Sequence, residues 1–137
     1  MASQMKIKPI EKTELDSKCK DGVQVFEWLN GTKEWWMSGK RHRLDGPAIE
    51  KENGNKEWWV AGVRHRLGGP AVELSCGYKE WFVNGFLSRI DGPAIEYENG
   101  EKEWWYYGNH YHSEEAWFEA LTKEEKLDYL FNMKGVK

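Results

Sequence analysis

The sequence contains little proline and cysteine and no long apolar run. Its 137 residues include four prolines and two cysteines. Cys19 and Cys76 lie far apart and match no metal-binding or redox spacing, so two free thiols are expected. No stretch is long and apolar enough to span a membrane, and the N-terminus lacks the apolar segment of a signal peptide. These absences predict a cytoplasmic protein without a membrane partner.

An excess of basic residues is also missing. The chain has 20 Lys and Arg against 23 Asp and Glu, which gives a formal net charge of -3. Because domains that bind a phosphate backbone are usually basic, a nucleic-acid polymer is not an expected partner.

The motifs of catalysis and cofactor binding are absent as well. There is no glycine-rich phosphate loop, no nucleophile elbow and no paired catalytic constellation. His42 and His65 are too far apart to share one ion, and His110 with His112 has no further ligand nearby. The sequence therefore predicts no enzyme, no catalytic residue, no cofactor and no metal site.

What the chain does contain is aromatic residues, 15% of the total with nine tryptophans, and they recur with a fixed period. Lys-Glu-Trp occurs every 23 residues, at 33–35, 56–58, 79–81 and 102–104. Gly-Pro-Ala occurs in step with it, at 46–48, 69–71 and 92–94. The four stretches that begin at Lys33, Lys56, Lys79 and Lys102 are numbered units 1 to 4 below. Such a period predicts an array in which each unit contacts mainly its neighbours.

Each unit is expected to form two short strands. The first is of the Lys-Glu-Trp-Trp-Val type and the second of the Pro-Ala-Ile-Glu-Tyr type. Asn-Gly joins a second strand to the next first strand, which is the strongest short signal of a β-hairpin. The predicted fold is mainly β, a single-layer antiparallel meander of about eight strands over residues 21–112. Residues 1–20 precede it as an N-terminal segment, with an extra edge strand as one alternative.

The C-terminal segment, 113–137, has a helical composition. Ser113 is placed as a helix N-cap and Thr122 opens a capping box, after which Leu127, Leu130 and Phe131 fall on one helical face. Two short helices here would cover the last strand of the meander, so this segment is predicted to be a cap.

Neighbouring tryptophans point to opposite faces of a strand, and the pairing register decides which face is the core. A two-residue loop at Asn-Gly sets Ile49 opposite Trp58 but Glu50 opposite Glu57. A three-residue loop sets Ile49 opposite Glu57 and Glu50 opposite Lys56. Burying an isoleucine stabilises by about 1.5–3 kcal/mol, whereas a like-charge pair costs about 0.2–1 kcal/mol. The prediction is therefore the two-residue loop, with the first tryptophan of each pair in the core.

We call Trp35, Trp58, Trp81 and Trp104 the first tryptophan row, and Trp36, Trp59, Phe82 and Trp105 the second aromatic row. In the predicted register the second row lies over alanine floors, in slots rimmed by glutamates. One interpretation is that these rings only stabilise the sheet; the other is a surface that binds a cation or a basic protein. The candidate binding residues on this face are Trp36, Trp59, Phe82, Trp105, Glu57 and Glu80.

A second group of candidate binding residues lies in the loops. These residues are Arg43, Arg66 and Arg89 at one repeat position, with His42 and His65 directly before the first two. Arg43 and Arg89 stand two residues before an aspartate and are expected to pair with it and brace the turn. Gly68 replaces that aspartate after Arg66, so Arg66 is the loop arginine best suited to bind an anion.

The 23-residue unit resembles the MORN (membrane occupation and recognition nexus) repeat. The pattern Lys-Glu-Trp-Trp-x-x-Gly-x-x-His-Arg-x-Asp-Gly-Pro-Ala-x-Glu is more similar still to tandem-repeat proteins of bacteriophages and large DNA viruses. The resemblance covers about residues 21–112 and implies a β-hairpin array. It also implies scaffolding, dimerisation or phospholipid binding. The doubled tryptophan and the Gly-Pro-Ala differ from the MORN pattern, and with the acidic balance they argue against lipid.

The viral resemblance implies a small protein of the host cytoplasm that binds and inhibits a host protein with a basic surface, such as an antiviral-defence factor. An alternative is a protein that sequesters a nucleotide, with the base stacked in an aromatic slot and the phosphate held by loop arginines. A second alternative is a structural scaffold or oligomerisation repeat, including a homodimer.

Overall fold

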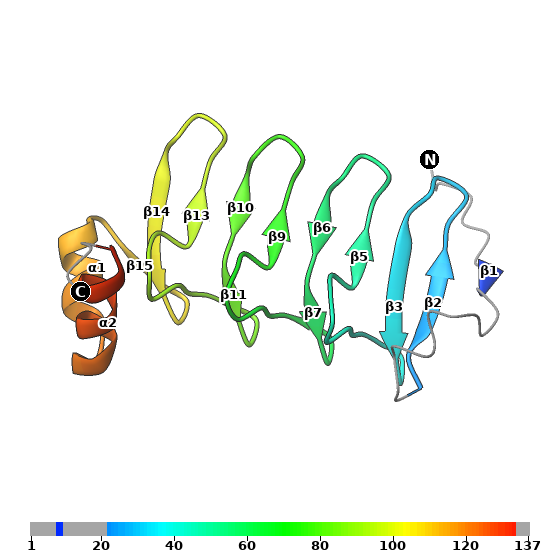
Figure 1. The fold of residues 1–137 in the computed structure, drawn as a ribbon, viewed down its shortest axis with the longest axis horizontal. Coiled ribbons are helices and arrows are strands. Elements are labelled where there is room, and N and C mark those ends of the chain that lie inside the picture. Colours follow the sequence, from blue (N-terminus) through cyan, green and yellow to red (C-terminus); the bar gives the residue numbers. More distant parts are fainter. Residues whose placement is uncertain (1–7, 10–21, 134–137) are drawn as a thin grey trace.

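The computed structural model, which describes residues 8–9 and 22–133, is an elongated row of hairpins with two helices at its C-terminal end (Figure 1). The main sheet is antiparallel and follows the order β1-β2-β3-β5-β6-β9-β10-β13-β14-β15, with β4 paired to β3. β7–β8 and β11–β12 form separate two-stranded sheets. The predicted antiparallel meander with a helical cap is therefore confirmed, with more and shorter strands than expected.

The elements of the described chain have the following bounds. The strands are β1 (Lys8–Pro9), β2 (Gln24–Glu27), β3 (Lys33–Met37), β4 (Lys40–Arg41), β5 (Ile49–Glu50), β6 (Lys56–Glu57), β7 (Trp59–Val60), β8 (Val63–Arg64), β9 (Val72–Glu73), β10 (Lys79–Glu80), β11 (Phe82–Val83), β12 (Phe86–Leu87), β13 (Ile95–Glu96), β14 (Lys102–Tyr106) and β15 (Asn109–Tyr111). The helices are α1 (Glu114–Ala120) and α2 (Lys123–Met133). Neither described helix has the length and apolarity needed to cross a bilayer.

Little of the N-terminal segment 1–20 lies within the described residues. Its one described element, β1, pairs with β2 through Lys8 and Glu27 at the edge of the main sheet. Cys19 falls outside the described residues, and Cys76 is an exposed free thiol.

The register at the Asn-Gly turns differs from the predicted one. Ile49 lies opposite Glu57 and Glu50 lies opposite Lys56, so the two-residue loop was wrong and the three-residue loop is present. The same pairing recurs in the later hairpins, where Glu73 faces Lys79 and Glu96 faces Lys102. Each hairpin thus gains an opposite-charge pair instead of a like-charge pair.

The loop itself explains this register. Gly54 closes it with a φ of 93°, the left-handed conformation that the last residue of a three-residue hairpin requires. The side-chain oxygen of Asn53 accepts a hydrogen bond from the Asn55 backbone N–H at 3.0 Å. Ile49 still becomes buried, at 5% exposure, because both faces of the sheet carry aromatic rings. Hydrophobic burial therefore does not discriminate between the two registers.

A second set of tight turns connects the strands at the opposite end of each unit (Figure 1). Both central residues of each turn have positive φ, the pattern of a type I′ hairpin. The turns are Ser38-Gly39, Ala61-Gly62, Asn84-Gly85 and Tyr107-Gly108. They give the hairpins β3–β4, β7–β8, β11–β12 and β14–β15. The sequence analysis, which assigned turns only at the Asn-Gly that joins a second strand to the next first strand, did not predict them.

The C-terminal helices form as predicted and cover the last unit. Ser113 Oγ accepts from the Ala116 N–H at 3.1 Å, and Thr122 and Glu125 exchange the two bonds of a capping box. Trp117 is fully buried and packs on Trp104 with ring centroids 4.7 Å apart.

The predicted apolar face of α2 stays in solvent instead, with exposures of 59% for Leu127, 37% for Leu130 and 56% for Phe131.

Candidate functional site

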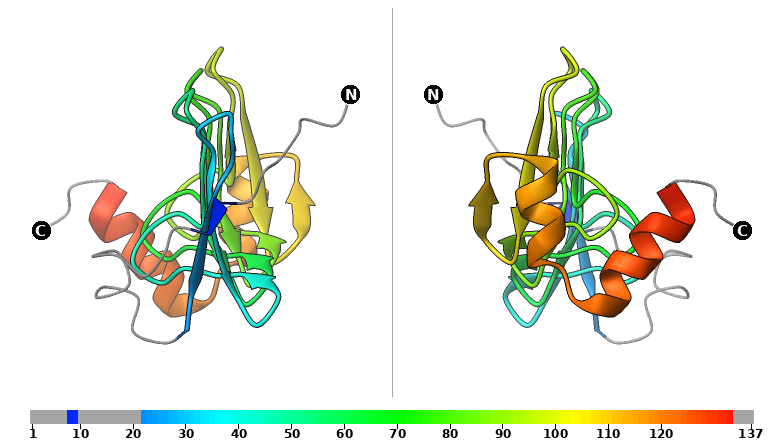
Figure 2. Two further views of the ribbon diagram at one scale, coloured as in Figure 1. Left: turned by 90° about the vertical axis from the view of Figure 1, so that its right-hand side faces the viewer. Right: turned by 90° about the vertical axis from the view of Figure 1, so that its left-hand side faces the viewer.

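The two faces of the array carry different side chains. Viewed along the row of hairpins, the type I′ hairpins spread to one side of the main sheet, and the arginine-bearing loops and α2 lie on the other (Figure 2). We call the side with the first tryptophan row and these loops the loop face. The side with the second aromatic row is the ladder face.

On the loop face, each loop arginine is fixed above a tryptophan of its own unit. The guanidinium carbons of Arg43, Arg66 and Arg89 lie 3.9, 3.8 and 3.9 Å from the ring centroids of Trp35, Trp58 and Trp81. In every case Nη1 donates to the carbonyl of the proline in Gly-Pro-Ala, at 3.0 Å. It also donates to the glutamate of the second strand, at 3.2, 3.1 and 3.4 Å. This arrangement, named the arginine clamp, accounts for the loop motif.

The glycine of Gly-Pro-Ala is required by the clamp. A Cβ at Gly46, Gly69 or Gly92 would lie 2.7–2.8 Å from the guanidinium carbon of its own unit. The alanine that follows is fully buried in all three units. The predicted alanine floor of the ladder face is therefore wrong: the alanines lie on the loop face, close beneath the clamps.

The clamp of unit 2 has one partner fewer than the other two. Arg43 Nε donates to Asp45 at 2.8 Å and Arg89 Nε donates to Asp91 at 2.7 Å, as predicted. Gly68 takes the place of the aspartate in unit 2. The Arg66 side chain is 29% exposed, against 15% for Arg43 and 16% for Arg89.

The two candidate histidines connect successive units. His42 Nδ1 accepts from the Ala61 N–H at 3.0 Å, and His65 Nδ1 accepts from the Asn84 N–H at 2.9 Å. In unit 3 the same bond is made by Ser88 Oγ, which accepts from the Tyr107 N–H at 3.0 Å. Each donor is a positive-φ residue of the next type I′ turn. We call these three bonds the staples, and they give both histidines a structural role.

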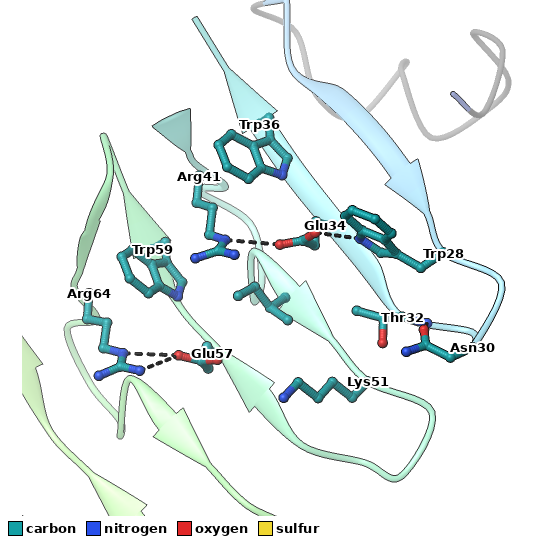
Figure 3. A pocket seen from close by; sticks show the side chains of 11 residues that line it. Trp28, Asn30, Thr32, Glu34, Trp36, Arg41, Lys51, Glu57, Trp59 and Arg64 are labelled. Atoms are coloured by element: carbon teal, nitrogen blue, oxygen red, sulfur yellow. Dashed lines mark hydrogen bonds and ion pairs between the residues drawn. The ribbon is translucent and has the colours of Figure 1, made fainter. Parts of the chain in front are cut away.

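On the ladder face, arginines fill the spaces between rings of the second aromatic row (Figure 3). Arg41 lies 5.2 Å from the Trp36 ring centroid and 5.3 Å from that of Trp59. Arg64 lies 5.3 Å from Trp59 and 5.5 Å from Phe82. The floor consists of Ile49, Val72 and Ile95, each buried and placed opposite a glutamate. We name this row, in which the second-row rings alternate with side chains of the paired hairpin strands, the ladder.

The glutamates of the ladder face are hydrogen-bonded rather than free. Glu34 accepts from Arg41 at 3.0 Å and from the Trp28 indole, and Glu57 accepts twice from Arg64, at 3.0 and 2.8 Å (Figure 3). A groove of about 640 Å³ runs over these groups in units 1 and 2. Arg41 and Arg64 therefore occupy the aromatic slots of units 1 and 2, where the sequence analysis placed a partner's cation.

Unit 3 departs from this pattern. The residue paired with each second-row ring is Arg41, Arg64, Leu87 and His110 in units 1 to 4. Leu87 therefore stands where units 1 and 2 have arginine. The third glutamate, Glu80, accepts a hydrogen bond from the Tyr78 hydroxyl and forms no ion pair among the described residues.

The surroundings of Glu80 are acidic. Burial, followed by the hydrogen bond to Glu80, raises the pKa of Tyr78, and the charges of Glu80 and Glu103 add to the shift. The hydrogen bond to Glu103 raises the pKa of Tyr97, whose ring lies 5.4 Å from that of Tyr78. In unit 4, Glu103 also lies 3.4 Å from His110, which stacks on Trp105. Negative charge thus accumulates in units 3 and 4.

Sequence reasoning missed the residues that complete the ladder, namely Arg41, Arg64, Leu87, Tyr78 and Tyr97. The available signal was the glycine two residues before each ladder arginine. Once Ser38-Gly39 is read as a two-residue turn, Arg41 must face Trp36 on the same side of the hairpin.

Comparison of the chain with family models, with curated proteins and with solved structures found no match. Among the described residues, no group of three or more His, Cys, Asp or Glu side chains is arranged to hold a metal ion.

Proposed function

We propose that this chain is a non-enzymatic protein-binding module that receives a basic side chain of its partner on the ladder face of units 3 and 4. The observation that carries the proposal is the substitution of the ladder arginine by Leu87 while its acceptor, Glu80, is retained. In units 1 and 2 the same position holds a guanidinium between two rings and against a glutamate.

The chemistry at unit 3 suits a guanidinium or an ammonium group. Phe82 and Trp105 are half-buried rings at the positions that flank arginines elsewhere in the ladder. Glu80 and Glu103 supply carboxylates, and each accepts a hydrogen bond from a neighbouring tyrosine hydroxyl. Cation–π attraction and charge both favour a positive group here.

The resemblance to viral repeat proteins extends the proposal to a host protein as the partner, with inhibition as the consequence of binding in the host cytoplasm. Sequestration of a nucleotide has less support, because arginines of the chain itself fill the aromatic slots of units 1 and 2. A structural scaffold or a homodimer is the second alternative.

The test is to place an arginine of the chain itself at the ladder position of unit 3. In Leu87→Arg, the new guanidinium should pair with Glu80 and occupy the proposed site, so the melting temperature should be equal or higher. Calorimetry with a hexa-arginine peptide should show binding to the parent chain and about tenfold weaker binding to this variant, the loss of one charged hydrogen bond. Leu87→Met should bind like the parent.

A matched control separates the site from net charge. Leu29→Arg adds the same charge at a position that is 73% exposed and lies outside the ladder. If Leu29→Arg weakens peptide binding as much as Leu87→Arg does, the effect is only overall charge and the proposal is wrong. Affinity capture from a bacterial lysate with the same four chains tests whether a protein partner shows the same order of binding as the peptide.

A further inference from the structure

A second feature of the array also consists of one missing charged partner, but on the opposite face. We propose that Arg66 is a binding site for a single carboxylate group, which takes the place of the aspartate present in units 1 and 3. This inference does not depend on the proposed function, because its residues belong to the loop face.

The complete clamps show where the carboxylate binds. In units 1 and 3 the arginine holds two carboxylates, one through Nη1 and one through Nε. In unit 2, Nη1 of Arg66 is bonded to Pro70 and Glu73, as in the other clamps. Within the described part of the chain, Nε of Arg66 has no acceptor, whereas Nε of Arg43 and of Arg89 each has one.

The free Nε–H is held in a fixed orientation. The guanidinium plane is set by the Trp58 ring, by the Pro70 carbonyl and by the absence of a side chain on Gly69. A ligand therefore meets a donor that needs no further ordering, which reduces the entropy cost of binding. Gly68 has no atom near the position of its missing Cβ, so the approach on this side is open.

A groove leads to this position. It has a volume of about 600 Å³ and runs between the loops of units 2 and 3 and helix α2. Leu67 and Ile90 lie at its rim and are 76% and 41% exposed. They offer apolar contact to the methylene groups that carry a carboxylate.

The charges in the groove select the kind of anion. Asp91, Glu125 and Asp128 line it together with Arg66 and Arg89, and both arginines already hold a glutamate. A phosphate dianion would meet more repulsion here than a carboxylate, which carries one charge and matches the geometry of the missing aspartate. The site therefore favours the acidic side chain of a protein segment or a small free carboxylate over a nucleotide.

The experiment follows the arginine Nε–H signals by NMR during titration. With acetate, and with an end-blocked peptide containing one glutamate between two leucines, the Arg66 signal should shift to saturation. The signals of Arg43 and Arg89 are internal controls and should stay in place, because their Nε–H groups are already bonded. Tighter binding of the peptide identifies a protein segment as the source, and equal or weaker binding identifies a small carboxylate.

Two variants at one position complete the test. Gly68→Asp supplies the carboxylate from within, so its Arg66 signal should resemble those of Arg43 and Arg89 and should respond about tenfold less to the probes. Gly68→Asn imposes the same backbone demand at a φ of 83° without the charge, and it should still respond. The proposal is overturned if the Arg66 signal does not move in the parent chain, if all three arginine signals move together, or if adenosine monophosphate shifts it more than acetate does.

Discussion

Both faces of this array place arginine side chains over tryptophan rings, but on one face the contacts lie within a unit and on the other they connect neighbouring units. On the loop face, Arg43 lies over Trp35 of its own unit and bonds to Asp45 and Glu50 of the same unit. On the ladder face, Arg41 lies between Trp36 of its own unit and Trp59 of the next. The clamp therefore stabilises a unit, and the ladder stabilises the contact between units. A doubled tryptophan supplies one ring for each purpose.

The largest effect should separate the two rings of one pair. Trp35 is 1% exposed and packs with Val25 and Ala48, so Trp35→Ala should lower the free energy of unfolding by about 3–5 kcal/mol or prevent folding. Trp36 is only half-buried, and Trp36→Ala should cost clearly less. Urea denaturation of both variants gives the values. Equal losses would mean that the two faces contribute alike, which would contradict the comparison.

A smaller effect should separate the two kinds of arginine. Arg89→Lys removes a planar group that stacks on Trp81 and makes three hydrogen bonds at 16% exposure, and it should cost about 1.5–3 kcal/mol. Arg64 is 38% exposed, so Arg64→Lys on the ladder should cost less than about 1 kcal/mol. Thermal unfolding of the two variants in the same buffer provides the measurement. A larger loss at Arg64 would reverse the roles assigned to the faces.

The smallest effect concerns the turns of the type I′ hairpins. Ala61 adopts a φ of 50°, a conformation that asparagine tolerates better than alanine, and Asn84 holds the same position in unit 3. Ala61→Asn should stabilise the chain by about 0.5–1 kcal/mol, and the reciprocal Asn84→Ala should destabilise it by a similar amount. Differential scanning calorimetry would detect both shifts. The same sign for both changes would show that contacts with the neighbouring hairpin outweigh backbone strain.

The period, the Asn-Gly hairpins and the helical caps were predictable because each depends on local sequence. The pairing register was not, since both Trp58 and Trp59 lie on faces that bury apolar residues. Burial of Ile49 then carries no information about the register, and the loop geometry at Gly54 decides. The positive-φ turns were missed for a related reason: only Asn84-Gly85 has the typical sequence, while Ala61-Gly62 is forced into the same shape by its place in the array.

The candidate sites were predictable only in part. The loss of the aspartate near Arg66 was visible in the sequence, because the partner lies two residues away in units 1 and 3. The other loss, at Leu87, was not, because Arg41 and Glu34 are seven residues apart and meet only through the type I′ hairpin. Residues that form a site across a turn can be identified in the sequence once the turn itself has been assigned.

The staples run in one direction along the chain. Each joins a backbone N–H of one unit to a side chain of the unit before it, so the row has a distinct head and tail. Tyr111 occupies the staple position of unit 4 and packs against the Trp117 cluster of the helical cap instead. Every internal boundary thus has the same donor on one side and an acceptor on the other, and a further copy of 23 residues would present both. Duplication within the gene can therefore change the number of units. Such a change would alter the length of the array while the cap and the individual sites remain as they are.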